Sequence, residues 1–365
     1  MNSQLLVLDL GLFQMKIGFS GDEAPRYTNM SCVGYSKNEA ITSSQENRQV
    51  LVGENALKVK NFLNLKESIN TDYSIDFSTV EKVLHELFYA QMKVNILDFP
   101  VFVSMNSFFT YEDKHKLIEV FFEHFNLPSL FFTFSGVTGI YSEGRTNGII
   151  IDSGHSGSSI IQVFEGLQVD NELICNRKGG IETRKGIKGI TDRIIQERCL
   201  KKENTKSHHF DLYGFKLDFT FYDELKKTCF SEEEIDVTLP DGSVVKFTKD
   251  DFASLNKENV SNCGDLLLKL FETSKNDYMG DLKEHVYVQG GNTLFPGYEE
   301  SLSAYLIEKK ADGVNIIPRN NDEKMFSSWI GSSIYASLET TKDILVSKSD
   351  FNDQGADYII KKNLL

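Results

Sequence analysis

The clearest pattern in the chain is a short apolar run that ends in an aspartate and leads into a hairpin. Residues 5–8 form one such run, which ends at Asp9, and residues 148–151 form another, which ends at Asp152. Apolar runs of this length are typical of strands buried on both faces. A short turn and a second apolar run, closed by glycine, follow each aspartate. Two copies about 143 residues apart predict a duplicated unit whose hairpins face one cleft.

Three further segments carry apolar residues at helical spacing, and they are residues 80–88, 111–125 and 326–338. Thr110, with Asp113 three positions later, is the expected N-cap of the second segment. Because helices alternate with apolar strands, the sequence predicts the α/β class. Two polar stretches, 36–48 and 201–209, predict exposed loops, and the Leu-Pro-Asp-Gly run at 239–242 predicts a hairpin turn.

Composition narrows the class of protein. The chain has 365 residues, of which 40% are hydrophobic and 12% aromatic, so it can bury the core of two domains or of one bilobed domain. The formal net charge of −14 argues against a protein that binds nucleic acid directly through its phosphates. Five dispersed cysteines without a CxxC pair offer neither a zinc site nor a disulfide framework. Neither a signal peptide nor an apolar stretch of ~20 residues is present, so we expect an intracellular protein without membrane insertion.

Two glycine-containing turns offer places for a phosphate-bearing ligand. Residues 154–158 (Gly-His-Ser-Gly-Ser) follow the second strand, and small residues let a phosphate approach backbone N–H groups closely. Asp152 beside them suits hydrated Mg²⁺, which takes few carboxylates and keeps its waters. A strand-end aspartate also stabilises turns, so both interpretations stay open. Gly290 and Gly291 follow the apolar strand 285–288, where they either form a turn or admit a flat ligand.

Four ordered motifs resemble the actins and actin-related proteins from end to end of the chain. They are residues 18–26 (GFSGDEAPR), 144–154 (GRTNGIIIDSG), 290–297 (GGNTLFPG) and 329–338 (WIGSSIYASL) with Ser347-Lys348. The resemblance implies an actin-like fold of two RNase-H-like lobes, with four subdomains around a nucleotide cleft. It implies ATP or ADP, together with Mg²⁺ or Ca²⁺, as the cofactor.

The same resemblance divides the chain and assigns a site. The small lobe comprises residues 1–135 and 326–365, with subdomain 2 at about 31–68. The large lobe comprises 136–325, with subdomain 4 at about 186–257. The implied nucleotide contacts are Asp9, Gly11, Lys16, Asp152, Ser153, Gly154, Gly290, Gly291, Asn292 and Met325. Asp9 and Asp152 are the implied metal-binding residues, acting through water.

The first hairpin departs from the family pattern where it would cradle phosphate. The family has small polar residues and glycine at positions that read Leu10, Leu12 and Phe13 here. Leucine supplies no hydroxyl, and a phenylalanine in place of glycine blocks close approach to the backbone. We therefore expect Phe13→Gly, alone or with Leu12→Ser, to open the hairpin and to strengthen nucleotide binding.

Positions that serve the metal, the attacking water and the adenine also differ. His155 stands where the family has an acidic residue facing the metal's waters. Ser135 and Ser159 replace the glutamine and the histidine that assist the attacking water. Met325 replaces the lysine that stacks on adenine, unless the alignment slips by one residue to Lys324. These changes predict nucleotide binding with weak or no ATP hydrolysis, and they assign no catalytic residue.

The sequence therefore predicts a divergent actin-related protein, a structural subunit of a cytoskeletal multiprotein complex in the cytoplasm. A nuclear actin-related subunit of a chromatin-remodelling complex and an active, polymerising actin-like ATPase are the alternatives. A phosphotransferase of the sugar-kinase superfamily is a further rival, but its substrate-binding insertions have no visible place in the sequence.

The expected partners are actin or other actin-related subunits. Between Gly34 and Gly53 the subdomain 2 loop is polar, so it offers little apolar area to a neighbouring subunit. By contrast, Tyr141, Ile334 and Leu338 are predicted to line a cleft that receives a partner helix. The apolar stripe to which the last two belong is also compatible with a buried core position.

Overall fold

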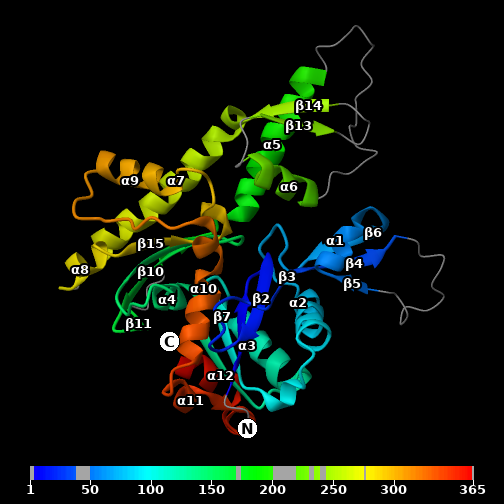
Figure 1. The fold of residues 1–365 in the computed structure, drawn as a ribbon, viewed down its shortest axis with the longest axis vertical. Helices are drawn as coiled ribbons and strands as arrows, with labels where there is room; N and C mark the ends of the chain where they lie inside the picture. The colour runs from blue at the N-terminus through cyan, green and yellow to red at the C-terminus, as the bar shows by residue number, and fades with distance from the viewer. Residues whose placement is uncertain are drawn as a thin grey trace.

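The computed structural model describes most of the chain, namely residues 4–37, 50–169, 174–199, 219–229, 234–238, 244–274 and 277–363. These residues form a mixed α/β structure with two large sheets and two small ones (Figure 1). Among them, no helix is both long enough and apolar enough to cross a membrane.

The first large sheet contains the first of the two predicted hairpins. Its strands, in the order in which they pair, are β16 (Val346–Ser347), β8 (Ser129–Phe134), β7 (Val101–Met105), β1 (Leu6–Leu10), β2 (Gln14–Phe19) and β3 (Tyr27–Met30). Strand β1 pairs antiparallel with β2, which places Asp9 opposite Lys16, and it pairs parallel with β7. Strand β16 comes from the C-terminal part of the chain, so this sheet joins both ends of the sequence.

The second large sheet repeats this arrangement. Its strands are β11 (Leu167–Gln168), β10 (Ser158–Phe164), β9 (Gly148–Ser153) and β15 (Val286–Gln289), with β12 (Ile174–Asn176) paired to β10. Strand β9 pairs antiparallel with β10, which places Asp152 opposite Ser159, and it pairs parallel with β15. The predicted duplicated unit is therefore present, with an aspartate at the equivalent register position of each hairpin.

Two small sheets extend the two halves. Strands β5 (Val50–Val52), β4 (Cys32–Ser36) and β6 (Leu63–Glu67) form one, next to α1 (Glu54–Lys58) and η3 (Lys60–Phe62). Strands β13 (Glu234–Thr238) and β14 (Val244–Thr248) form the other, near α5 (Gly180–Cys199) and α6 (Phe219–Cys229) (Figure 1). The predicted turn at 239–242, the loop at 201–209 and residues 38–48 of the other loop lie outside the described residues.

Helix α10 (Asn321–Ala336) separates the two large sheets. It packs on β1 and β7 on one side and on β15 and α4 (Ser135–Tyr141) on the other. Trp329 donates from Nε1 to the Val7 carbonyl oxygen at 3.1 Å, and it is fully buried. Gly331 allows the close approach to α4, because a Cβ there would lie 1.6 Å from the Thr138 carbonyl oxygen. Helix α10 therefore fixes the spacing between the sheets.

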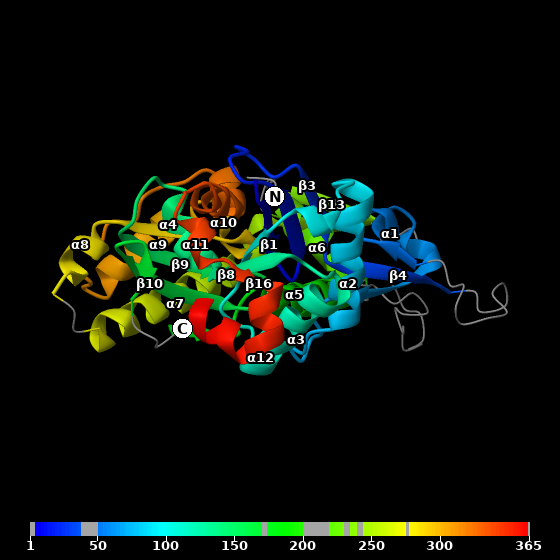
Figure 2. The same ribbon diagram turned by 90° about the horizontal axis from the view of Figure 1, so that it is seen from below.

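The opposite face of the first sheet is covered by other helices. Figure 2 shows α2 (Phe77–His85), α3 (Tyr111–Glu119) and α12 (Lys348–Asn363) together on that side, and their apolar residues share one core with β1 and β7. The predicted cap of the helix after Thr110 is confirmed, since Thr110 and Asp113 form a capping box. Helix α10 begins five residues before the predicted start, because Asn320 and Glu323 cap it there.

The remaining helices complete the two halves. They are η4 (Glu86–Gln91) after α2, η5 (Ile96–Asp98), η6 (Val120–His124) after α3, α7 (Lys249–Thr273), α8 (Met279–Lys283), η7 (Gly291–Thr293), α9 (Tyr298–Glu308) and α11 (Thr341–Ile344). Helices α7, α8 and α9 form a second core with β9 and β15. The first core draws on residues 6–132, Ile181 and residues 346–360, and the second on residues 149–316, while the lobe boundaries stay a prediction.

Candidate functional site

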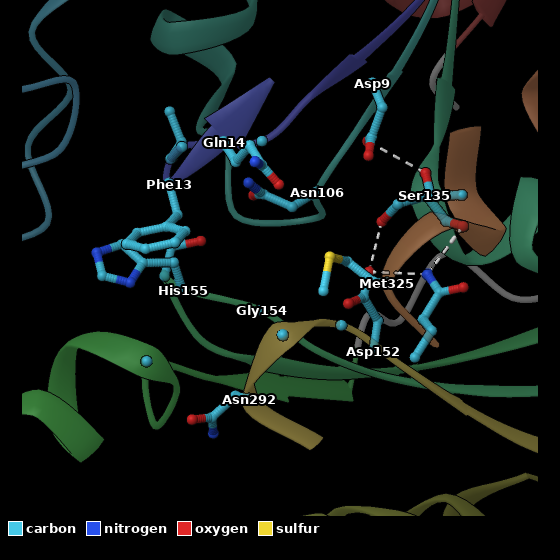
Figure 3. Close-up of a pocket in the computed structure, with 18 of the residues that line it drawn as sticks. Asp9, Phe13, Gln14, Asn106, Ser135, Asp152, Gly154, His155, Asn292 and Met325 are labelled. Atoms are coloured by element: carbon cyan, nitrogen blue, oxygen red, sulfur yellow. Dashed lines mark hydrogen bonds between the residues drawn. The ribbon is translucent and has the colours of Figure 1, made fainter. Parts of the chain in front are cut away.

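A cavity of about 460 Å³ lies where the two aspartate-bearing hairpins face each other (Figure 3). Its volume falls within the range of small-molecule sites. Nine of the ten predicted site residues line it, namely Asp9, Gly11, Lys16, Asp152, Gly154, Gly290, Gly291, Asn292 and Met325. The tenth, Ser153, is buried behind the wall, where its Oγ accepts a hydrogen bond from Asn292 Nδ2 at 3.2 Å.

Asp9 is held by an ammonium group and two hydroxyl groups. Lys16, on the neighbouring strand, donates from Nζ to Asp9 Oδ2 at 2.6 Å. The other carboxylate oxygen accepts from Ser104 Oγ at 3.3 Å and from Ser328 Oγ at 3.2 Å. Lys16, near the start of β2, therefore lies opposite the carboxyl end of β1. Its ammonium group is beside the cavity that Lys16 and Asp9 both line.

Asp152 has a different set of partners. Ser135 Oγ donates to Asp152 Oδ2 at 2.5 Å, and Gln289 Nε2 donates to the same oxygen at 3.1 Å (Figure 3). Burial raises the pKa of Asp152, while these two hydrogen bonds oppose the rise. Ser135, which the sequence aligns with the family's water-orienting glutamine, thus has its hydroxyl proton committed to Asp152.

Direct metal coordination has little support in the described part of the chain. No group of three or more histidine, cysteine, aspartate or glutamate side chains there lies close enough to hold a metal ion. The sequence assigned Asp9 and Asp152 to a metal only through water, an arrangement that Mg²⁺ favours and that needs few carboxylates. That assignment stays a prediction.

The two glycines after β15 serve different purposes. Gly290 has a φ of 97°, and a Cβ there would lie 2.4 Å from the Ser153 carbonyl oxygen, so the turn requires glycine. A Cβ at Gly291 would meet nothing within 4 Å, and at Gly154 it would meet only Asp152 Oδ1 at 4.0 Å. Gly290 therefore makes the turn, whereas Gly291 leaves bare backbone beside the cavity, and the admission of a flat ligand there stays a prediction.

Lys324 and Met325 both line the cavity, but only the lysine has a charged partner. Lys324 Nζ donates to Glu299 Oε2 at 2.6 Å, and both side chains are more than nine-tenths buried. The lysine is therefore paired within the protein, and Met325 has its thioether in the space between the two hairpins (Figure 3).

Leu10 and Leu12 border the cavity, but their side chains belong to the core beside it. Their side chains are buried in the core of the first sheet, with exposed fractions of 0% and 3%. A serine hydroxyl at position 12 would lie in this apolar core, so the burial of Leu12 argues against the expectation that Leu12→Ser strengthens nucleotide binding.

Phe13 lies within the cavity and contacts the opposite hairpin. Its ring packs on the His155 imidazole with centroids 5.0 Å apart and planes at 40° (Figure 3). Burial holds the pKa of His155 well below its usual range, and the cations of Arg184 and Lys226 lower it further. The imidazole is therefore neutral and supplies no charge to a phosphate or to a metal.

The structure adds a charged network that the sequence did not reveal. Arg184 donates to both oxygens of Glu67, at 2.8 and 2.9 Å, and to both oxygens of Asp223, at 2.9 and 2.7 Å. Next to it, Lys226 Nζ donates to Asn292 Oδ1 at 2.9 Å, and burial lowers the pKa of Lys226 to about 8. Glu67 belongs to β6, whereas the other charged residues belong to α5 and α6, so the network joins the two halves.

Two similar strand-and-hairpin units on either side of a cavity of ligand size define the class of this mixed α/β protein. Comparison with protein families gives the same result over nearly the whole chain, because the family model described as Actin matches residues 1–209 and 219–364. The chain belongs to the actin family, and its mixed α/β architecture agrees with the actin fold.

Proposed function

We propose that this actin-family protein binds an adenine nucleotide between its two hairpins and acts through protein contacts as a structural subunit of a cytoskeletal complex. The observation that carries the proposal is the cavity itself. It brings together two strand-end carboxylates, the Lys16 ammonium group near the start of β2 and bare glycine backbone from both halves of the chain.

The lining residues supply complementary chemistry for such a ligand. Lys16 would donate to phosphate oxygens, and Gly154 lets a phosphate approach the backbone. Gly291 leaves room for a flat base, on which the Met325 thioether would pack. Asp9 and Asp152 would hold the waters of a bound Mg²⁺ or Ca²⁺, which supplies positive charge to the phosphates. The residues present fit a nucleotide, with the phosphate side less well provided than in the family pattern.

Slow or absent hydrolysis is part of the proposal. The Ser135 hydroxyl proton is committed to Asp152, and Ser159 is only 2% exposed, so neither is free to orient a water. His155 is neutral and packed against Phe13. With neither serine available to position the attacking water, bound nucleotide would stabilise the closed fold rather than drive a cycle.

An exposed apolar surface at the end of α10 supports a role in protein contacts. Ile334 and Leu338 are 40% and 42% exposed, so the apolar stripe leaves the core at this end of the helix. The neighbouring rings of Tyr141 and Tyr335 are stacked, with centroids 4.7 Å apart. We assign this surface to a helix of a partner, such as another actin-family subunit or a protein that binds one.

Two measurements test the proposal. Heat-denatured, freshly purified protein should release adenine nucleotide on analysis by ion-exchange chromatography, and Lys16→Met should reduce the amount at least about tenfold. Absence of bound nucleotide, and of any nucleotide binding by the folded protein, would contradict it. Purification of the native protein with its partners separates the cytoskeletal assignment in the cytoplasm from the nuclear, chromatin-remodelling alternative.

A further inference from the structure

The two hairpins are in direct contact through Phe13 and His155. Phe13 belongs to the turn between β1 and β2, and His155 belongs to the turn between β9 and β10. Their rings are 5.0 Å apart, and both side chains line the cavity. In Figure 3 this pair lies to the left, away from Asp9 and Asp152 on the right. The contact therefore closes the space between the hairpins at one end of the cavity.

We propose that the Phe13–His155 contact makes the site selective for a nucleoside diphosphate over the corresponding triphosphate. The inference rests on the proposed function, because it assumes that the phosphates of an adenine nucleotide lie between the hairpins. With the phosphates in this place, a diphosphate fills the space up to the ring pair, and a third phosphate must displace one of the rings.

Neither ring is free to move away without cost. Phe13 is fixed through its backbone, since its carbonyl oxygen accepts a hydrogen bond from Ser31 N at 2.8 Å. His155 is held by the start of α5, where its carbonyl oxygen accepts from Ile181 N at 2.9 Å. A Cβ at Gly180 would lie 2.8 Å from His155 Nδ1, so α5 already touches the imidazole. The backbone of both residues is therefore fixed and α5 lies against the imidazole, so a ring can leave the contact only by rotating about its own side-chain bonds.

The charges around the cavity also favour a diphosphate over a triphosphate. The described lining contains the carboxyl groups of Asp9, Glu54, Asp152 and Asp223 but only three ammonium groups, those of Lys16, Lys226 and Lys324. Two of these ammonium groups are already paired, Lys16 with Asp9 and Lys324 with Glu299. The neutral His155 adds no positive charge. An additional phosphate brings negative charge to a lining with four carboxyl groups against three ammonium groups, two of which are in ion pairs, and this costs binding free energy.

Calorimetric titration of the purified protein with ADP and with the non-hydrolysable analogue β,γ-imido-ATP, both in saturating Mg²⁺, tests the inference. We expect the analogue to bind at least about tenfold more weakly than ADP. Phe13→Gly and His155→Ala should each bring the two affinities to within about threefold. Because both variants remove the same contact, the double variant should change the ratio little further.

The titration needs a control variant, and three results would count against the inference. Phe62→Ala removes a phenylalanine that is 75% exposed on η3, so it should leave the ratio unchanged. Equal or tighter binding of the analogue by the unaltered protein would overturn the inference, and so would an unchanged ratio in both folded single variants. If neither nucleotide binds the folded protein, the proposed function fails and the inference falls with it.

Discussion

Arg184 on α5 holds Glu67 on β6 through two parallel hydrogen bonds of 2.8 and 2.9 Å, and thereby ties the two halves of the molecule together beside the cavity. The same guanidinium group forms a second pair of bonds with Asp223. The Arg184 side chain is only 10% exposed and that of Glu67 16%. Bidentate pairs of this kind are strong, and removing one partner leaves a buried charge uncompensated.

Arg184→Met should therefore destabilise the protein and speed the release of bound nucleotide. Loss of one partner of a buried pair costs about 3–5 kcal/mol, and the value here lies toward the lower end because Glu67 can reach water. Denaturant unfolding and the displacement of a fluorescent ADP analogue measure the two effects. Lys188→Met is the matched control, since its exposed pair with Asp192 lies within α5. Equal release rates in both variants would contradict the prediction.

Purified protein should release phosphate from ATP far more slowly than actin under the same conditions. Removal of one positioning or electrostatic group typically lowers a rate about 10²–10³-fold, and both water-assisting positions are serines here. A coupled phosphate-release assay measures this directly, with actin in parallel as the reference. Release at a rate comparable to that of actin would show that another residue positions the water.

Leu12→Ser should lower stability without strengthening nucleotide binding. The Leu12 side chain is buried in the core of the first sheet, and truncation of a buried leucine costs about 2–5 kcal/mol. Leu12→Met, which conserves volume, should cost less than about 1.5 kcal/mol. Chemical denaturation and ADP titration of both variants give the answer. Tighter ADP binding by folded Leu12→Ser would mean that the hairpin adopts another path when the ligand is present.

Lys226 should give the stability of the protein a recognisable pH dependence. Burial lowers its pKa to about 8 from an ordinary value of 10.5, so the unfolded chain binds more protons than the folded protein between these values. The contribution of this group to the unfolding free energy therefore rises as the pH increases from 8 to 10.5. Relative to Lys226→Met, the unaltered protein should gain stability across that window. The Lys188→Met control should show no such relative gain. If the difference in unfolding free energy between the unaltered protein and Lys226→Met does not change with pH, the lowered pKa of Lys226 is refuted.

The protein alone should not form long filaments. Head-to-tail assembly needs two complementary ends, and the loop at one end is polar between residues 36 and 49 apart from Ala40 and Ile41. A net charge of −14 adds repulsion, although a Debye length of ~8 Å at physiological salt screens most of it. Sedimentation at high protein concentration with ATP, Mg²⁺ and salt tests this. Filaments of the pure protein in the pellet would rule the prediction out.

Local pattern was enough to predict the parts of the structure that depend on neighbouring residues. The apolar runs before Asp9 and Asp152 are strands, and the turns after them are the hairpins that line the cavity. Thr110 caps its helix because an acidic residue follows three positions later. Asn320 and Glu323 carry the same signal, so the true start of α10 was also readable from the sequence.

Other parts depend on how distant segments meet, and no local pattern reveals them. Arg184 lies 117 positions from Glu67 and 39 from Asp223, and nothing in their spacing indicates that they pair. Alignment with a family shows that Leu12 occupies a phosphate-contacting position, but it does not show that the side chain turns into the core. The contact between Phe13 and His155 likewise requires the two hairpins to be placed relative to each other.

The register of the two hairpins has a consequence for how a ligand is oriented. Equivalent positions pair Asp9 with Lys16 in one unit and Asp152 with Ser159 in the other. Two identical units would present the same groups to a ligand whichever way round it entered. Because a lysine stands in one unit and a buried serine in the other, the two units present different groups to the cavity. A molecule whose two ends differ therefore has a preferred direction of binding.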